Sequence, residues 1–289
     1  MSLTPNLRTR AEALGQAMPA LLAEADVLAA HVMLGEHGRR RAGQGDEFWQ
    51  YRLAGAGDAA RSIDWRRSGR SDVQFVRERE WQAAQSVTLW VDSSQSMAFS
   101  GDKSRASKAD CAKLVGLALG VLLLRAGERV GLSGSTPPRP GRAQLLALAA
   151  ALSSDAGEDY GTPDVTGLAS HGRAVFLSDF LGPMDGIETA MAFASDRGVK
   201  GVLLQVLDPV EEEFPFSGRT VFESMTGTLR HETQDASGLR QRYLDRLAER
   251  KDRLTALAGR MGWHYQCHHT GQPAQTALLW AYMALKGGK

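Results

Sequence analysis

The strongest constraint on the fold is that short apolar runs alternate with longer helical stretches in the second part of the chain. The apolar runs are SVTLWVD (86–92), RVGLS (129–133), RAVFLSD (173–179), KGVLLQVLD (200–208) and GWHYQCHH (262–269). The intervening stretches predict helices near 104–126, 142–153, 184–197, 238–260 and 273–285. Continuous apolar runs joined by helices are typical of a parallel sheet that is covered on both faces. The sequence therefore predicts an α/β fold with a doubly wound, mostly parallel sheet.

Two other regions precede this domain, which we expect to span residues 86–289. Residues 1–30 have leucines and alanines near one stripe, which predicts an amphipathic N-terminal helix. Residues 31–85 are rich in Arg, Gly and aromatic residues and predict a β-type extension of short strands separated by Gly turns. The segment 219–233 predicts a β-hairpin added to the edge of the sheet.

Composition limits the classes of function. Lys and Arg (34) nearly balance Asp and Glu (33), so the net charge of +1 gives no overall field for nucleic acid or an anionic membrane. Charged residues within the first twelve interrupt the apolar core that a signal peptide needs. The most apolar run, LVGLALGVLLL (114–124), has 11 residues, whereas a bilayer span needs about 20. With two cysteines, too few for a disulfide framework, we expect a cytoplasmic protein that neither inserts into membranes nor binds nucleic acid.

Acidic residues end two of the predicted strands. The loop after the first strand reads Asp92-Ser93-Ser94-Gln95-Ser96, and the third strand ends at Asp179. In a doubly wound sheet, ligands bind beyond the carboxyl ends of the strands. Alternate residues of an extended loop point the same way, so the Asp92 carboxylate and the hydroxyls of Ser94 and Ser96 should converge. Hard oxygen donors of this kind suit Mg²⁺ or Mn²⁺.

These motifs resemble two related groups of proteins. The loop DSSQSM after an apolar strand resembles the metal-ion-dependent adhesion site (MIDAS) of von Willebrand factor A domains. The block at 43–81 resembles the signature of the bacterial domain-of-unknown-function 58 family. The matching motifs are Gly57-Asp58, Arg61, Ile63-Asp64-Trp65, Arg67 to Arg70, Ser178-Asp179-Phe180, and Leu207-Asp208-Pro209 with Glu211. The similarity covers roughly residues 35–285.

The resemblance implies a von Willebrand factor A-like fold and a set of metal ligands. These are Asp92, Ser94 and Ser96, a threonine from a second loop, and Asp179 as an acid behind the direct ligands or bridged to the ion by water. Thr162 is our candidate for the threonine, with Thr136 and Thr166 nearby in sequence. The resemblance also implies a MoxR-type AAA+ ATPase as partner, and a role in the assembly or maturation of other proteins. An acidic residue of the partner would complete the coordination of the ion.

Residues 39–80 hold ten arginines, no lysine and seven interleaved acids. A nucleic-acid surface usually lacks such acids, whereas Arg is favoured where carboxylates are gripped in a planar, bidentate manner. We expect an internal ion-pair network that joins this region to the sheet. The alternative is a docking surface for an acidic partner with Trp49 and Trp65 as aromatic anchors.

A cluster of zinc-binding residue types near the C-terminus does not predict zinc. In a strand over 262–269, His264 and His268 would lie on one face about 13 Å apart, too far to share one ion. Cys267 would face the opposite side from these two. We therefore expect core packing and polar edge residues here.

Three functions remain open at this point. The first is a metal-dependent protein-binding adaptor. The second is a Mg²⁺-dependent hydrolase or phosphoryl-transfer enzyme. It is disfavoured because no nucleophile elbow, P-loop, general base or Lys/Arg clamp accompanies the Asp92 loop in sequence. The third is a structural domain with a degenerate metal site.

Overall fold

The computed structural model describes residues 23–32, 49–55, 63–69, 73–79, 84–153, 158–228 and 230–287. The chain divides into two units. One consists of Met1–Leu34 together with Gln85–Lys289, and the other of Gly35–Ala84. The larger unit carries the predicted doubly wound sheet.

The larger unit is built on a six-stranded sheet with the order β10-β7-β6-β3-β4-β5. The strands are β3 (Ser86–Val91), β4 (Arg129–Leu132), β5 (Thr136–Arg139), β6 (Arg173–Ser178), β7 (Lys200–Leu207) and β10 (His264–His269). All neighbours pair in parallel except β4 and β5. The fold is therefore α/β with a mostly parallel sheet, as the alternating pattern predicted.

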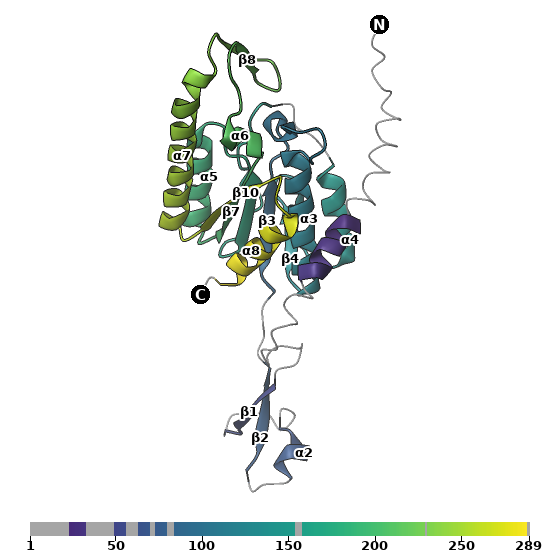
Figure 1. The fold of residues 1–289 in the computed structure, drawn as a ribbon. Coiled ribbons are helices and arrows are strands. Elements are labelled where there is room, and N and C mark those ends of the chain that lie inside the picture. The colour runs from purple at the N-terminus through teal and green to yellow at the C-terminus, as the bar shows by residue number, and fades with distance from the viewer. Residues whose placement is uncertain are drawn as a thin grey trace. The chain divides into compact units, whose positions relative to one another are not determined.

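Helices cover both faces of this sheet (Figure 1). One face carries α3 (Lys108–Arg125), α4 (Arg142–Ala151) and α8 (Ala274–Lys286), and the other carries α5 (Met184–Asp196) and α7 (Ser237–Arg260). Two separate clusters of buried apolar side chains follow from this arrangement, one on each face. The central strands are buried on both sides, which explains why their sequences are continuous apolar runs.

A helix over residues 23–32 belongs to the larger unit. Its buried residues Ala25, Ala29 and Val32 recur at helical spacing and join the core cluster that contains α3 and α4. The part of the predicted N-terminal helix before residue 23 lies outside the described residues.

The glycines of the apolar run in α3 allow the helix to approach the sheet closely. A Cβ built on Gly116 would lie 3.0 Å from a methyl group of Val91 on β3. At its N-terminus α3 has a capping box, in which Ser107 accepts a hydrogen bond from the Asp110 backbone and Asp110 accepts one from Ser107. No helix among the described residues combines the length and apolar character needed to cross a bilayer.

Two short elements differ from the sequence-based expectations. The predicted hairpin forms β8 (Thr220–Glu223) and β9 (Arg230–Thr233), but these strands make a separate two-stranded sheet and do not extend the edge of the main one. The edge next to β4 is instead occupied by β5, whose two prolines gave little strand signal. A further short helix, α6 (Pro209–Glu213), follows β7 directly.

The smaller unit contains an antiparallel pair, β1 (Trp49–Leu53) and β2 (Phe75–Arg79), and one turn of helix, α2 (Trp65–Ser68). The hydroxyl of Ser68 accepts a hydrogen bond from the backbone of Phe75 (2.9 Å), which ties α2 to β2. The Trp65 side chain is 59% exposed. The side chains of Trp49 and of most arginines in the arginine-rich block lie outside the described residues, so neither interpretation of that block is tested.

Candidate functional site

The candidate site lies at the carboxyl ends of the two central strands, β3 and β6. These strands pair in parallel, with Val91 opposite Leu177. From β3 the chain continues through α3 to β4 on one side, and from β6 through α5 to β7 on the other. Ligands bind at such a switch point in doubly wound sheets. Asp92 and Asp179 are the first residues after these strands.

Asp92 is held as a buried carboxylate with two hydrogen bonds. Asp92 is 2% exposed. One oxygen accepts from the Ser94 backbone (2.8 Å) and the other from the Ser178 hydroxyl (2.6 Å). Burial raises the pKa of Asp92, the hydrogen bonds oppose this effect, and the charge of Asp179 adds to it. A buried anion in this position would gain from a nearby cation.

The two serines of the loop lie beside each other. Ser94 is buried, and its hydroxyl oxygen is 3.3 Å from that of Ser96. Backbone hydrogen bonds fix the loop from outside, because Gln95 donates to Glu158 (2.8 Å) and Ser96 to Asp159 (2.9 Å). The predicted convergence of the Ser94 and Ser96 hydroxyls is therefore present in the geometry.

The segment that fixes the serine loop continues into the predicted second loop. The Gly161 backbone lies against Asp92, since a Cβ on Gly161 would be 2.2–2.7 Å from the carboxylate atoms. Thr162 follows directly and packs on the first turn of α5, where a Cβ on Gly186 would be 2.7 Å from its methyl group. Of the three candidate threonines, Thr162 is thus the one adjacent to a residue that touches Asp92.

The other two threonines make local contacts. The hydroxyl of Thr136, on the edge strand β5, accepts a hydrogen bond from the Leu132 backbone (3.1 Å). Thr166 is exposed and its backbone donates to Asp164 (2.7 Å) in a turn. Neither contact involves Asp92.

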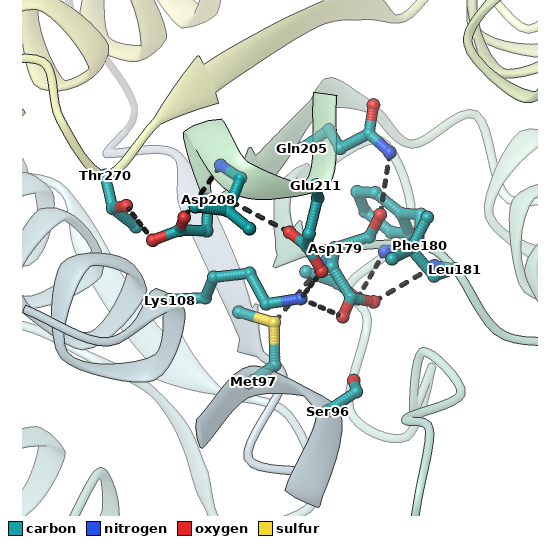
Figure 2. A network of polar contacts seen from close by, with 12 residues as sticks. Ser96, Met97, Lys108, Asp179, Phe180, Leu181, Gln205, Asp208, Glu211 and Thr270 are labelled. Atoms are coloured by element: carbon teal, nitrogen blue, oxygen red, sulfur yellow. Dashed lines mark hydrogen bonds and ion pairs between the residues drawn. The ribbon is translucent and has the colours of Figure 1, made fainter. Parts of the chain in front are cut away.

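Asp179 is engaged by a lysine that the sequence did not suggest (Figure 2). Lys108, the first residue of α3, donates to Asp179 Oδ2 (2.8 Å) and to Glu211 Oε1 (2.7 Å). The Lys108 side chain is 1% exposed. The other oxygen of Asp179 accepts from the Leu181 backbone (3.0 Å). The carboxylate of Asp179 is therefore already paired.

Charge and burial compete within this network. Burial disfavours the ammonium of Lys108, but Asp179 and Glu211 outweigh burial, and the pKa of Lys108 is raised. Burial also raises the pKa of Glu211, although Lys108 opposes that shift. Glu211 has a second role, because it accepts from the Asp208 backbone (2.8 Å) and so closes the capping box of α6. The network joins α3, β6 and α6 through one buried cation.

Sequence reasoning identified Glu211 only as part of a family motif and missed Lys108. Lys108 reaches Asp179 from the start of α3, although the sequence around the Asp92 loop did not suggest it. No local signal marks this lysine, since it lies 71 residues from Asp179 and 103 from Glu211. The Asp179 backbone also donates to the sulfur of Met97 (3.2 Å), the residue after Ser96, which links this network to the serine loop (Figure 2).

The histidine cluster is divided between the two faces of β10. His268 is fully buried and neither ring nitrogen has a hydrogen-bond partner among the described residues. Burial, with a smaller contribution from His269, lowers the pKa of His268 to about 4, so this ring is neutral. His268 is thus a core residue, as predicted. Cys267 and His269 occupy the opposite face and lie near Glu212 and Lys251.

Comparison with known proteins agrees with the sequence motifs. The model of the family described as "Protein of unknown function DUF58" matches residues 50–253. Uncharacterized proteins of Mycobacterium bovis and Mycobacterium tuberculosis are 27% identical over 208 residues. That match covers 66% of this chain and 64% of those relatives, so it spans less than two thirds of their length.

Two solved structures from Bacteroides species are similar over 70% of this chain and 99% of theirs. One is an aerotolerance-related membrane protein from Bacteroides fragilis, at 16% identity and a TM-score of 0.40. The other is the conserved hypothetical protein BatB from Bacteroides thetaiotaomicron, at 14% identity and a TM-score of 0.36. Scores this low carry no functional inference.

Proposed function

Because the chain belongs to the DUF58 family, we propose that it is a protein-binding module that holds a divalent cation at the carboxyl ends of β3 and β6. The proposal interprets the D-x-S-x-S loop as a metal-ion-dependent adhesion site of the von Willebrand factor A type. The observation that carries it is the grouping of Asp92, Ser94 and Ser96 at the switch point, with the two hydroxyl oxygens 3.3 Å apart.

These donors fit Mg²⁺ or Mn²⁺. Neighbouring oxygens in an octahedron around Mg²⁺ are about 3.0 Å apart, given metal–oxygen distances of about 2.1 Å. The spacing of the Ser94 and Ser96 hydroxyls is close to that value. Asp92 would supply the anionic ligand, and Thr162 is the candidate donor from the second loop. Because its oxygens are engaged by Lys108 and Leu181, Asp179 would act through water.

This arrangement favours a partner that brings a carboxylate. If Asp92 is the only acid that binds the ion directly, the divalent ion and its one carboxylate ligand together keep a net positive charge. The ion pair of Lys108 with Asp179 limits the negative charge that Asp179 adds nearby. An Asp or Glu side chain from another protein would then find an electrophilic ion with a free position, and contacts around it would supply specificity.

We propose a MoxR-type AAA+ ATPase as that partner, by analogy with the family, and a cytoplasmic adaptor role in assembly or maturation of other proteins. No catalytic activity is part of this proposal. Lys108 does not favour phosphoryl transfer, because its ammonium is already paired with Asp179 and Glu211. A phosphate clamp would need free donors aimed at the ion.

The test is a binding experiment between the purified chain and a purified MoxR-type ATPase, with Mg²⁺ or with EDTA. We expect binding in Mg²⁺ only, and its loss in Asp92→Asn. The matched control is Asp185→Asn, an exposed acid at the start of α5, which should bind as the wild type does.

Two outcomes would replace the proposal. Equal binding in EDTA and Mg²⁺ would indicate a structural domain with a degenerate site. Mg²⁺-dependent hydrolysis of a phosphate ester that disappears in Asp92→Asn would indicate the enzyme alternative.

A further inference from the structure

A second cluster of ligand-type side chains lies at the carboxyl ends of β7 and β10. Cys267 and His269 are alternate residues of β10, so they point to the same face of the sheet. Glu212 approaches them from α6. One potential ligand atom of each residue lies within 4.8 Å of the other two. Among the described residues this is the one group of three or more His, Cys, Asp or Glu side chains with such spacing.

The donor set is that of a zinc site with an open position. Thiolate sulfur, imidazole nitrogen and carboxylate oxygen are the three zinc ligands used by proteins, and three protein ligands leave a fourth position for water or substrate. In a tetrahedral site such donors are about 3.3–3.6 Å apart. Side-chain movement of roughly 1 Å would bring the present cluster to that spacing. His264 and His268 lie on the other face of β10 and do not belong to this cluster.

The contact between His269 and Glu212 supports shared coordination. His269 Nε2 is 2.8 Å from Glu212 Oε2, but it has no partner that meets hydrogen-bond geometry among the described residues. The ring nitrogen and the carboxylate oxygen therefore face each other, and they would have to move slightly apart to share one cation.

Lys251 supplies the positive charge within this cluster. Its ammonium, from α7, forms an ion pair with Glu212 Oε1. It also interacts with the thiol of Cys267. The side chains of Lys251, Glu212 and His269 are 22–31% exposed. A bound cation would compete with Lys251 for the carboxylate.

We propose that Glu212, Cys267 and His269 form a binding site for Zn²⁺ or a similar thiophilic divalent cation, and that Lys251 occupies the carboxylate when the ion is absent. The site is separate from the Asp92 loop and does not depend on the function proposed for that loop. Binding replaces the Lys251 contact and displaces the thiol proton of Cys267 to solvent.

The test uses Co²⁺ as a spectroscopic probe, followed by competition with Zn²⁺, on the full chain. With excess Mg²⁺ present to fill the Asp92 loop, we expect a sulfur-to-cobalt charge-transfer band that saturates at one Co²⁺ per chain and that Zn²⁺ abolishes. Cys267→Ser should lose the band. Cys111→Ser is the matched control, because Cys111 is the other cysteine of the chain and is buried in α3, and it should keep the band.

Two further variants keep the proposal falsifiable if Cys267→Ser does not fold. His269→Gln should weaken Co²⁺ binding by more than about tenfold, and Lys251→Met should strengthen it because the competing charge is removed. A charge-transfer band that survives in Cys267→Ser, or its absence from both the wild type and Lys251→Met, would overturn the assignment. Binding that is unchanged in His269→Gln would do so as well.

Discussion

At the scale of single residues, the buried ammonium of Lys108 controls the chemistry next to the Asp92 loop. It pairs with two carboxylates in a region with little access to water. Removing one member of such a group leaves the others as uncompensated buried charges. The resulting loss of stability is larger than the net stabilisation that the ion pairs contribute. Lys108 is therefore a structural requirement of the site even if it never contacts a ligand.

We expect Lys108→Met to lower the free energy of unfolding by about 3–5 kcal/mol, measured by urea denaturation at neutral pH. Asp179 and Glu211 would remain buried without their cation. Lys103→Met is the control, because Lys103 is exposed, and its effect should stay within about 0.5 kcal/mol. Equal effects of the two substitutions would contradict the view that the buried pairs matter.

We expect the buried carboxylate of Asp92 to lower the stability of the metal-free protein and to be needed for ion binding. Its pKa in the folded state is raised above 3.8, chiefly by burial. Folding therefore favours the protonated carboxyl, and this contribution to stability is lost as the pH rises through the raised pKa. At neutral pH without metal, Asp92→Asn should raise the free energy of unfolding by about 1 kcal/mol, as at other function-constrained sites.

Asp92→Asn also separates the effect of the buried negative charge on stability from the effect of Mg²⁺ binding on stability. In thermal melts, saturating Mg²⁺ should stabilise the wild type by about 2–3 kcal/mol at a hundred times its dissociation constant, and Asp92→Asn not at all. A wild type that does not respond to Mg²⁺ would count against a metal at this loop.

At the scale of elements, the site depends on how closely one loop approaches another. The second loop passes so near to Asp92 that any side chain on Gly161 would overlap the carboxylate. That approach aligns the backbone of residues 158–159 with the serine loop through hydrogen bonds to Gln95 and Ser96. Position 161 requires a glycine because a larger side chain would overlap the Asp92 carboxylate, and hydrogen bonds hold that carboxylate in place.

Gly161→Ala should lower the free energy of unfolding by about 1–3 kcal/mol and weaken Mg²⁺ binding, because the loop must move away from Asp92. Gly259→Ala offers an informative comparison. Gly259 lies in α7 with no atoms within 4 Å of an added Cβ, so the substitution should stabilise the protein by about 0.5–1 kcal/mol. Urea denaturation of both variants provides the measurement, and a Gly161→Ala variant as stable as the wild type would show that the loop adapts.

At the scale of the whole molecule, the larger unit is assembled from two separate parts of the sequence. Residues 1–34 belong to it although residues 35–84 form the other unit. The helix over 23–32 contributes Ala25, Ala29 and Val32 to the core beside α3. This helix is therefore part of the doubly wound unit rather than a separate N-terminal region.

Ala29→Asp should destabilise the larger unit by about 2–4 kcal/mol, because it places a charge in that core. Val27→Asp, on the same helix, is the control, since Val27 is 56% exposed and should have an effect within about 0.5 kcal/mol. Near-ultraviolet circular dichroism during urea unfolding follows the change, since Trp90 and Trp263 lie in the larger unit. If Ala29→Asp behaved like Val27→Asp, the helix would not be packed on the core.

The sequence alone determined five of the six strands of the sheet and the residues at the ends of β3 and β6. Hydrophobic periodicity reports which residues share a face within one element, so β3, β6 and the positions of Asp92 and Asp179 could be read locally. The pattern gave weak signals for β5, with its prolines, and for the independent sheet of β8 and β9.

Only the tertiary structure decided which side chains meet across the strand order. Lys108 contacts Asp179 and Glu211 because α3 begins beside the end of β6 and α6 follows the neighbouring strand β7. Likewise, Glu212 meets Cys267 and His269 because β7 and β10 are paired. Such contacts join residues far apart in sequence, and local periodicity carries no information about the order in which strands pair.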